Sequence, residues 1–361
     1  MWSVAVSSGT PKGAPELIKS EIGQAWSLGV GASGALYLGS RVGGLDVYVA
    51  SIDFSTGQLL SPPVNPVPSH IGSNTAPQWS RDGKFLAYVS RRDVGSREAV
   101  IGIRSMDTGH VREVRPQLNT ISYYPATEWS PDGRAFVVQG TDPKGRDGIF
   151  RIDAQTGDVS PIVLAQQPDE SLGGPKWSPD GSKIYYRRSI PGVTDPAFIE
   201  RDVVSGADRQ IIQRGRGSLA ALDLSPDGRW IATVNQNASG GFSTLLVIPV
   251  TGGEPRELFR VKIPDRLTYP SWGPDASFVI ACKITMPGNE MCEHWQVPLS
   301  GGEPRKLNVD LHMSRTNGWI SVHPDGRQIA YGSGKNEYEI SMIENFLPAA
   351  TDQATARGAR R

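Results

Sequence analysis

The chain has 361 residues, of which 37 are basic and 37 acidic, so the formal charges cancel at pH 7. A balanced charge gives no global field for nucleic acid or an anionic membrane surface. No apolar stretch approaches the roughly 20 residues of a membrane-spanning helix. We therefore predict a protein with no nucleic-acid partner and no membrane span. The 41 glycines and 28 prolines are typical of a fold with many turns.

The first residues predict strands. Trp2 to Val6 is an apolar-rich strand candidate, followed by a Ser-Gly turn and by Pro15 to Ile18. The segment from Pro15 to Ile22 is compatible with a short helix or with an edge strand. The N-terminus has neither a charged region nor a long apolar core, so we expect no signal peptide in this chain.

A five-residue phrase then recurs along the whole chain. Its copies begin at Val30, Trp79, Trp129, Trp177, Leu224, Trp272 and Val322, and three of them read Trp-Ser-Pro-Asp-Gly or Trp-Ser-Arg-Asp-Gly. The positions equivalent to its Asp are 49, 50, 48, 47, 48 and 50 residues apart. A fixed period of this size is typical of repeat architectures.

Each copy predicts two strands joined by a tight turn. Ser-Pro-Asp-Gly suits a type I turn that ends in a left-handed glycine. An apolar run such as Phe85 to Val89 follows, with apolar residues on both faces, and then a third and a fourth strand separated by a Thr-Gly or Gly-Gly turn. Four strands per repeat predict an all-β fold, a seven-bladed β-propeller of four-stranded antiparallel blades. The first residue of the phrase is apolar in every copy, which favours core packing.

The phrase resembles the repeat of TolB-like β-propellers, which are similar in shape to WD-repeat propellers. The resemblance covers the chain from about Trp2 to Phe346. It implies a bacterial propeller that binds a protein or peptide at the mouth of its central channel, and it favours a periplasmic or extracytoplasmic location. The closing segment Tyr338 to Pro348 resembles the last strand of propellers attached to bacterial sensor kinases and winged-helix regulators.

Strands from the two ends of the chain are expected to close the ring. The last copy supplies strands at Gln328 to Tyr331 and Tyr338 to Ile343, and we predict that Pro15 to Ser20 completes the seventh blade. Trp2 to Val6 is then either an extra edge strand or the remnant of another blade, and six or eight blades remain alternatives. We predict one propeller domain over residues 1–348 and a disordered tail over 349–361.

The repeated aspartates do not predict a site. They occupy the same position in different blades, so the ring would hold them apart and no two could act as an acid/base pair. They are, in chain order, Asp82, Asp132, Asp180, Asp227, Asp275 and Asp325. Turn formation explains them.

Cys282, Cys292 and His294 lie within one predicted hairpin of the sixth blade. Three interpretations are open. The default is a pair of reduced, packed cysteines, because free cysteine behaves as a small apolar residue. A cross-strand disulfide would indicate an oxidising compartment. A metal site would need a fourth ligand that the sequence does not show.

The candidate binding residues lie in loops. Loops between the second and third strands, and loops between blades, emerge on one face of a propeller, and they carry exposed arginine and tyrosine, which are favoured at interfaces. The candidates are Arg91, Arg92, Arg97, Tyr123, Tyr124, Arg187, Arg188, His312 and Arg315. The alternative to a binding role is a charged rim that is exposed to solvent.

We predict a non-catalytic module that binds a protein or peptide through this loop face, as a monomer without cofactor or metal. A sensor or scaffold domain of a larger regulator is a second interpretation. The third is a propeller enzyme, a lyase or hydrolase with its active site at the channel mouth, although the sequence shows no catalytic residues for one.

Overall fold

A computed structural model of the chain describes residues 2–17, 25–42, 44–67, 73–91, 99–122, 127–193, 196–212, 219–236, 240–286, 289–313, 318–334, 337–344 and 346. The described residues form strands, turns and loops with no α-helix, which confirms the all-β prediction. The chain divides into two compact units. The larger consists of Gly44–Arg92 and Ser96–Gly334, and the smaller contains Met1–Gly43 and Lys335–Arg361.

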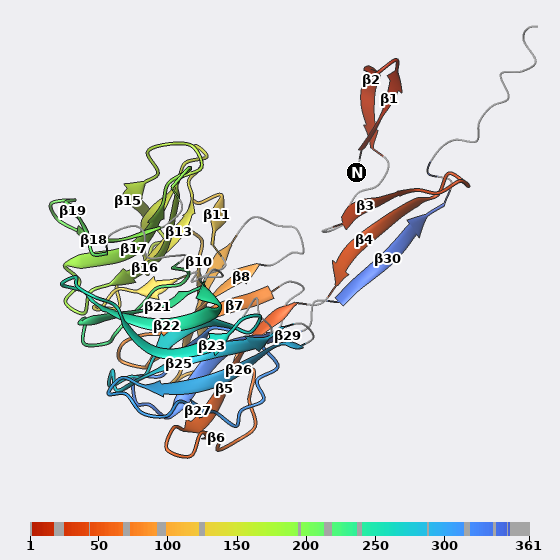
Figure 1. Cartoon of the computed structure of the whole chain (residues 1–361). Helices are drawn as coiled ribbons and strands as arrows, with labels where there is room; N and C mark the ends of the chain where they lie inside the picture. Colours follow the sequence, from red (N-terminus) through yellow and green to blue (C-terminus); the bar gives the residue numbers. More distant parts are fainter. Residues whose placement is uncertain are drawn as a thin grey trace, which may run out of the picture. The chain divides into compact units, whose positions relative to one another are not determined.

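Five antiparallel sheets of the larger unit each come from one copy of the repeat (Figure 1). The first contains β7 (Ser73–Trp79), β8 (Phe85–Arg91), β9 (Val100–Ser105) and β10 (Val111–Val114). The second contains β11 (Thr120–Ile121), β12 (Glu128–Trp129), β13 (Ala135–Thr141), β14 (Asp147–Asp153) and β15 (Val159–Leu164). The third contains β16 (Ser171–Trp177), β17 (Lys183–Ser189), β18 (Ala197–Asp202) and β19 (Asp208–Gln210). The fourth contains β20 (Asp223–Leu224), β21 (Trp230–Asn235), β22 (Phe242–Pro249) and β23 (Arg256–Lys262). The fifth contains β24 (Arg266–Trp272), β25 (Phe278–Thr285), β26 (Asn289–Pro298) and β27 (Arg305–Lys306).

The sixth sheet combines strands from distant parts of the sequence. Its order is β28 (Ile320–Val322), β29 (Gln328–Gly334), β5 (Leu45–Asp53) and β6 (Gln58–Leu59). The last copy of the phrase therefore supplies two strands of this sheet, and the region after the first copy supplies the other two. We predicted such mixing of strands, but with different partners.

The inner strands of the six sheets contact one another in turn. Contacts run from β7 through β12, β16, β20 and β24 to β28, and β28 contacts β7. Between β28 and β7 the backbone N–H of Trp79 donates to Ser321 Oγ at 3.3 Å, and the rings of Trp79 and His323 meet edge to face at 4.7 Å. This is the arrangement of propeller blades. Six such sheets are described, so the predicted count of seven is not confirmed.

The smaller unit contains one of the two strands predicted from the last copy, Tyr338 to Ile343, whereas the other, Gln328 to Tyr331, lies in the sixth sheet of the larger unit. β1 (Trp2–Ser7) pairs with β2 (Thr10–Leu17), and β4 (Leu36–Val42) lies between β3 (Ala25–Val30) and β30 (Glu337–Ile343). The prediction that Pro15 to Ser20 completes the last blade is wrong over Pro15–Leu17, because these residues extend β2. For the segment from Pro15 to Ile22, the structure confirms a strand and not a helix over Pro15–Leu17. Residues 18–24 lie outside the described part.

Apolar residues from adjacent sheets form the core of the larger unit. Phe136, Ile152 and Val89 belong to one such cluster between the first and second sheets. Trp79, Trp129, Trp177 and Trp272 are all buried, which confirms the core role of the phrase's first position in these copies. The prediction is wrong for Val30 in the smaller unit, which is 47% exposed.

The turn of the phrase is held by hydrogen bonds of its Ser and Asp. In the copy from Trp177, Ser178 Oγ donates to Asp180 Oδ1 at 2.6 Å, and the backbone N–H of Lys183 donates to Ser178 Oγ at 2.9 Å. The backbone N–H of Gly181 donates to Ser178 O at 2.9 Å, and Gly181 has a φ of 74°, which favours glycine. The turn role of the repeated aspartates is therefore confirmed.

These turns predict a loss of stability in acid. Hydrogen bonds from Ser178 and Ser182 lower the pKa of Asp180 to about 2. A lowered pKa in the folded state stabilises the protein above the unfolded value of about 3.9, and this stabilisation is lost as the pH falls toward 2. We expect Asp180→Ala to cost up to about 1 kcal/mol at pH 6, because the carboxylate is exposed and screened. The difference from wild type should shrink as the pH falls below about 4.

The measurement is urea unfolding followed by circular dichroism at pH 6, 4 and 3. The exposed Asp107 provides the control, as Asp107→Ala. A difference between Asp180→Ala and wild type that stays constant from pH 6 to pH 3 would contradict the prediction.

Candidate functional site

Side chains at one repeat position of the six sheets gather around one cavity. A cavity of about 510 Å³ opens at the end of the sheets where the phrase turns lie, and residues of all six sheets line it. We call this end the turn end. The residue that precedes the first position of the phrase projects into this cavity from each sheet, namely Gln78, Glu128, Lys176, Asp223, Ser271 and Ser321.

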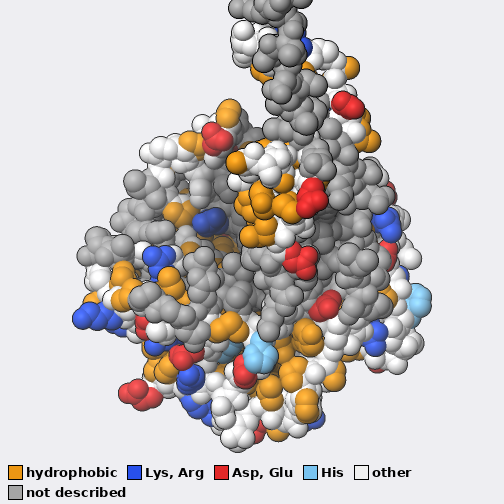
Figure 2. Space-filling model, turned by 90° about the vertical axis from the view of Figure 1, so that its right-hand side faces the viewer, with side chains coloured by type: hydrophobic (Ala, Val, Ile, Leu, Met, Phe, Trp, Pro, Cys, Tyr) orange, Lys and Arg blue, Asp and Glu red, His pale blue; other side chains and the backbone are white. Residues whose placement is uncertain are grey.

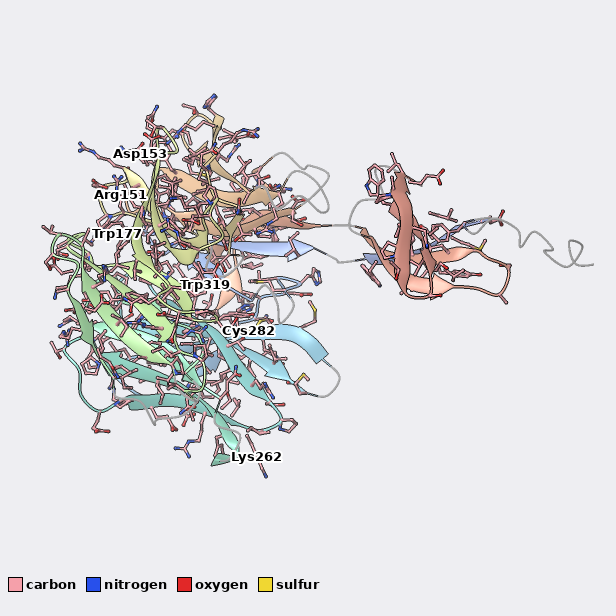
Figure 3. All side chains as sticks on the ribbon, turned by 90° about the horizontal axis from the view of Figure 1, so that it is seen from above. Arg151, Asp153, Trp177, Lys262, Cys282 and Trp319 are labelled. Carbon is pink, nitrogen blue, oxygen red and sulfur yellow. A yellow bond between two sulfur atoms is a disulfide. The ribbon has the colours of Figure 1, made fainter. Side chains whose placement is uncertain are left out.

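Three of these side chains form a buried ionic triad. Lys176 Nζ lies 2.8 Å from Glu128 Oε2 and 3.0 Å from Asp223 Oδ1. The Lys176 ammonium also lies over the ring of Trp319, 4.6 Å from its centroid. Trp177 and Trp319 lie among the sheets in Figure 3, whereas Lys262 lies at their edge. The triad joins the second, third and fourth sheets.

Neighbouring groups fix both carboxylates of the triad. Gln78 Nε2 donates to Glu128 Oε2 at 3.2 Å, and the backbone N–H of Trp272 donates to Asp223 Oδ2 at 3.0 Å. The indole N–H of Trp272 donates to Asp223 O at 3.2 Å. Each carboxylate is therefore held by a sheet next to its own.

The charge state of the triad favours a structural role. Burial opposes the charged form of Lys176 and would lower its pKa. The attraction of the carboxylates of Asp223 and Glu128 outweighs burial and raises the pKa of the ammonium. Burial also raises the pKa of Glu128, despite the nearby lysine. A lysine that stays protonated cannot act as a base or a nucleophile at neutral pH. Sequence reasoning missed the triad, although its members share one repeat position that could have been compared across the copies.

A second cavity lies at the opposite end of the sheets, which we call the loop end. Its volume is about 310 Å³, and it is lined by residues of four sheets and the segments next to them. Arg187 of β17, Gln139 of β13 and Tyr269 of β24 contribute polar groups, and Ala220, Ala221, Leu222 and Val234 contribute apolar walls. Tyr269 has a φ of 52° at a bulge of β24, and Ala76 has a φ of 51° at the equivalent bulge of β7, so this conformation belongs to the repeat.

The predicted site residue Arg187 lies in this loop-end cavity. Its guanidinium is half-buried, and burial alone lowers its pKa. Within the described residues it forms neither an ion pair nor a hydrogen bond. An uncompensated cation at a cavity wall is a candidate binding group.

Three other predicted residues are described, and two of them serve the fold. Arg91 Nη2 donates to Ile121 O at 2.8 Å, and Arg188 Nε lies 2.6 Å from the buried carboxylate of Glu170. His312 is exposed, with Nδ1 3.0 Å from Asp310 Oδ1. Arg92, Arg97, Tyr123, Tyr124 and Arg315 lie outside the described residues.

The two cysteines form a disulfide, so the default prediction of reduced thiols is wrong. Cys282 of β25 and Cys292 of β26 are joined, with Cα atoms 5.3 Å apart. They lie diagonally across the ladder, because Cys282 pairs with His294 and Cys292 pairs with Ile284. Burial lowers the pKa of His294 to about 4, so its ring is neutral at pH 7.

We expect loss of this disulfide to destabilise the protein moderately. Its cysteines are 10 residues apart, and the chain-entropy relation gives about 2–3 kcal/mol for closing such a loop. The free energy of unfolding of the double variant Cys282→Ala/Cys292→Ala should be lower by that amount. Its unfolding midpoint should therefore lie at a lower denaturant concentration. Dithiothreitol should lower the wild-type midpoint toward that of the variant and leave the variant unchanged. An equal effect of dithiothreitol on both proteins would refute the prediction.

Two features are absent from the residues that the structure describes, a cluster of metal ligands and a membrane-spanning helix. No three or more His, Cys, Asp or Glu side chains cluster in a way that could hold a metal ion. None of the described segments forms a helix long and apolar enough to cross a membrane. Apolar, basic and acidic side chains are interspersed among the described residues on the face in Figure 2.

Comparison with known proteins identifies TolB-like relatives. No family model matches the chain. An uncharacterised protein of Agrobacterium fabrum is 29% identical over 161 residues, 43% of this chain and 48% of its own length. The Tol-Pal system protein TolB of Francisella tularensis subsp. holarctica is 23% identical over 236 residues, 64% of this chain and 50% of its own length. The chain thus spans about half the length of the curated relatives it matches.

Solved structures show the same fold. A protein assigned as TolB from Agrobacterium tumefaciens has a TM-score of 0.63 at 19% identity, covering 82% of this chain and 100% of that one. TolB from Acinetobacter baumannii has a TM-score of 0.52 at 19% identity, covering 82% and 66%. A prolyl endopeptidase also matches, with a TM-score of 0.51 at 13% identity, covering 90% and 50%. The chain is a TolB-like β-propeller.

Proposed function

We propose that this TolB-like propeller is a non-catalytic module that holds a segment of a protein or peptide partner at its loop end. The observation that carries the proposal is the loop-end cavity of about 310 Å³, whose wall contains the uncompensated guanidinium of Arg187. The apolar walls suit a side chain, and the arginine suits a polar or charged group of the same segment. Such a module would serve as a scaffold or as the sensor part of a larger protein.

The remaining loop residues extend the proposed contact surface. Arg92, Arg97, Tyr123, Tyr124 and Arg315 lie outside the described residues, so the proposal for them rests on the sequence alone. Arginine and tyrosine are enriched at binding hot spots. We propose them as further partner contacts. Arg91 and Arg188 would act indirectly, since each is already bonded within the chain.

We propose an extracytoplasmic location. The Cys282–Cys292 disulfide supports it, because disulfides form and persist in oxidising compartments. The likeness to a Tol-Pal system protein agrees with this location. Labelling of the two thiols in intact cells, with and without prior reduction, measures their redox state.

The test of the binding function is affinity capture with a matched pair of variants. The immobilised chain is incubated with an extract of its native cell envelope, and captured proteins are identified by mass spectrometry. Arg187→Met should reduce capture of the partner by about tenfold or more, the effect of losing one charge-assisted hydrogen bond. Arg266→Met, an exposed arginine at the same end of the sheets, is the control. Equal capture by both variants and wild type would remove the loop-end cavity from the proposal.

A propeller enzyme is the second candidate function. It is favoured by Glu128, whose raised pKa suits a general acid at the wall of the cavity of about 510 Å³. The protonated Lys176 beside it argues against a nucleophile or base at this place. If the chain is an enzyme, turnover of an oligosaccharide or peptide library should depend on Glu128 and disappear in Glu128→Gln.

We also propose that the blades form a closed ring that can take up a seventh blade, as the seven copies of the phrase predict. Contacts in cyclic order among six inner strands support the closure. The registers of β4, β5, β29 and β30 support the seventh blade.

A further inference from the structure

Arg187 differs from the other basic residues of its sheet because no acidic side chain among the described residues pairs with it. Arg188 pairs with Glu170, Arg201 Nη1 lies 2.8 Å from Asp208 Oδ1, and Arg209 Nη2 lies 2.7 Å from Glu200 Oε2. Lys176 of the same sheet has two carboxylates. The fold thus neutralises each of these cations internally and leaves the guanidinium of Arg187 facing the loop-end cavity.

The surroundings of Arg187 leave room for a planar anion. Gly173 of β16 pairs with Arg187 across the ladder. A Cβ on Gly173 would lie 3.2 Å from Gln139 Oε1 and 3.8 Å from Arg187 Nη2, so the absent side chain keeps both polar groups accessible at one place. A guanidinium donates two parallel hydrogen bonds to a carboxylate, and the Gln139 amide would donate a third after rotating so that Nε2 takes the place of Oε1.

We propose that Arg187 and Gln139 form a subsite for a carboxylate of the partner segment, either an Asp or Glu side chain or a free C-terminus. This inference rests on the proposed binding function and names the group that is bound. The apolar walls formed by Ala220, Ala221, Leu222 and Val234 favour a carboxylate on a short apolar stem over a heavily hydrated anion such as phosphate.

The experiment uses three fluorescent peptides of one length, studied by fluorescence anisotropy with the full chain. The first alternates Ala and Glu and has an amidated C-terminus, the second replaces every Glu by Gln, and the third is the Gln peptide with a free C-terminus. The first or the third should bind at least about tenfold more tightly than the second, since one charge-assisted bond is gained. The first and third peptides distinguish a side chain from a C-terminus.

Variants assign this selectivity to the subsite. Arg187→Met should abolish the preference for the carboxylate, and Arg266→Met should keep it. Gly173→Val, which fills the space beside Arg187 without changing any charge, should also abolish it. Equal binding of all three peptides to wild type, or a preference that survives Arg187→Met, overturns the subsite. If Arg187→Met still captures the partner as well as wild type does, the binding function stands without this subsite.

A second inference comes from the register of four strands. In the five sheets built from one repeat, the residue three positions after the turn Asp pairs with the last residue of the third strand, as in Ala135↔Asp153 and Lys183↔Asp202. In the sixth sheet the equivalent residue Gln328 pairs with Ser51 of β5. In the smaller unit the equivalent residue Leu36 pairs with Ile343 of β30.

The same residues would pair in two ordinary hairpins. Val42 and Leu45 are separated only by Gly43-Gly44, and Gly334 and Glu337 only by Lys335-Asn336. A two-residue hairpin loop between β4 and β5 would pair Val42 with Leu45 and hence Leu36 with Ser51. A loop of the same length between β29 and β30 would pair Gln328 with Ile343. The observed pairing is thus an exchange of third strands between two hairpins without a shift of register.

Burial favours the hairpin arrangement for the first copy. Tyr37 of β4 is 38% exposed, whereas its counterparts in the six sheets of the larger unit, Leu86, Phe136, Ile184, Ile231, Val279 and Ile329, are all 0% exposed. Met342, its partner on β30, is 48% exposed. Burying these apolar side chains between blades would be favourable.

We propose that the chain populates both pairings and that the hairpin form carries seven blades. The two forms preserve which face of each strand is apolar, because the register of every ladder is unchanged. The two places where the strands would exchange partners, at Gly44 and at Gly334, lie close together. A Cβ on Gly334 would come within 2.2 Å of Gly44 O.

Engineered disulfides separate the two forms. Tyr37→Cys/Met342→Cys should cross-link in the exchanged form, and Tyr37→Cys/Ala50→Cys in the hairpin form. Dilute protein is oxidised, and cross-linked peptides are identified by mass spectrometry, with Cys282–Cys292 as an internal reference. Intramolecular cross-links in both variants support the exchange. A cross-link in only one variant, or cross-links only between copies, overturns it.

Discussion

Replacing Lys176 by methionine is expected to lower the free energy of unfolding by about 3–5 kcal/mol, because removal of one partner leaves buried charges uncompensated. Lys176 is 3% exposed and forms ion pairs with both Glu128 and Asp223. Without it, two carboxylates from different sheets face each other in the turn-end cavity. The loss should appear as a lower midpoint of guanidinium unfolding, followed by far-ultraviolet circular dichroism.

A second lysine of the same sheet provides the control for Lys176. Lys183 Nζ lies 2.9 Å from Glu200 Oε1, but its side chain is 39% exposed. Lys183→Met should therefore cost no more than about 1 kcal/mol. The triple variant Lys176→Met/Glu128→Gln/Asp223→Asn removes the charges together and should recover part of the stability. Equal costs for Lys176→Met and Lys183→Met would show that the triad is not an energetic link between sheets.

Trp129→Ala should destabilise the larger unit by about 3–5 kcal/mol, as expected for truncating a buried aromatic residue. The Trp129 ring packs 4.2 Å from the ring of Phe136, measured between centroids. Its indole N–H donates to Gln78 O of the preceding sheet at 3.2 Å. The substitution thus removes apolar contacts within one blade and a hydrogen bond to its neighbour. Guanidinium unfolding followed by circular dichroism measures the loss.

The control for Trp129 is an exposed tryptophan. Trp2 is 64% exposed in the smaller unit, so Trp2→Ala should change stability by no more than about 0.5 kcal/mol. Trp129→Phe keeps most of the apolar volume but loses the indole N–H, and it should fall between wild type and Trp129→Ala. A Trp129→Ala variant as stable as Trp2→Ala would mean that the phrase's first residue does not hold the blades together.

Much of the fold could be predicted from the sequence because its determinants are local. The Ser-Pro-Asp-Gly turn closes through bonds between residues a few positions apart, such as Ser178 with Asp180 and Lys183. The apolar runs after each turn form the second strands, as expected. The partners of β4, β5, β29 and β30 could not be predicted, because two pairings share one register and only long-range packing distinguishes them.

The site was less predictable than the fold. Arg187 and Arg188 are adjacent and looked equivalent, yet successive residues of a strand point to opposite faces. Arg188 meets Glu170, and Arg187 meets a cavity. The disulfide was one of three open interpretations, because the reach between Cys282 and Cys292 depends on the ladder register of β25 and β26.

The sequence by itself determined the all-β propeller repeat of this protein, since each repeat encodes its own turn and its own apolar strands. Only the tertiary structure decided which polar residues meet. Glu128, Lys176 and Asp223 are roughly one repeat apart in the chain, and the circular arrangement of the sheets brings them within hydrogen-bonding distance. The same arrangement leaves Arg187 without a counter-charge among the described residues, because no acidic side chain of a neighbouring sheet reaches its cavity.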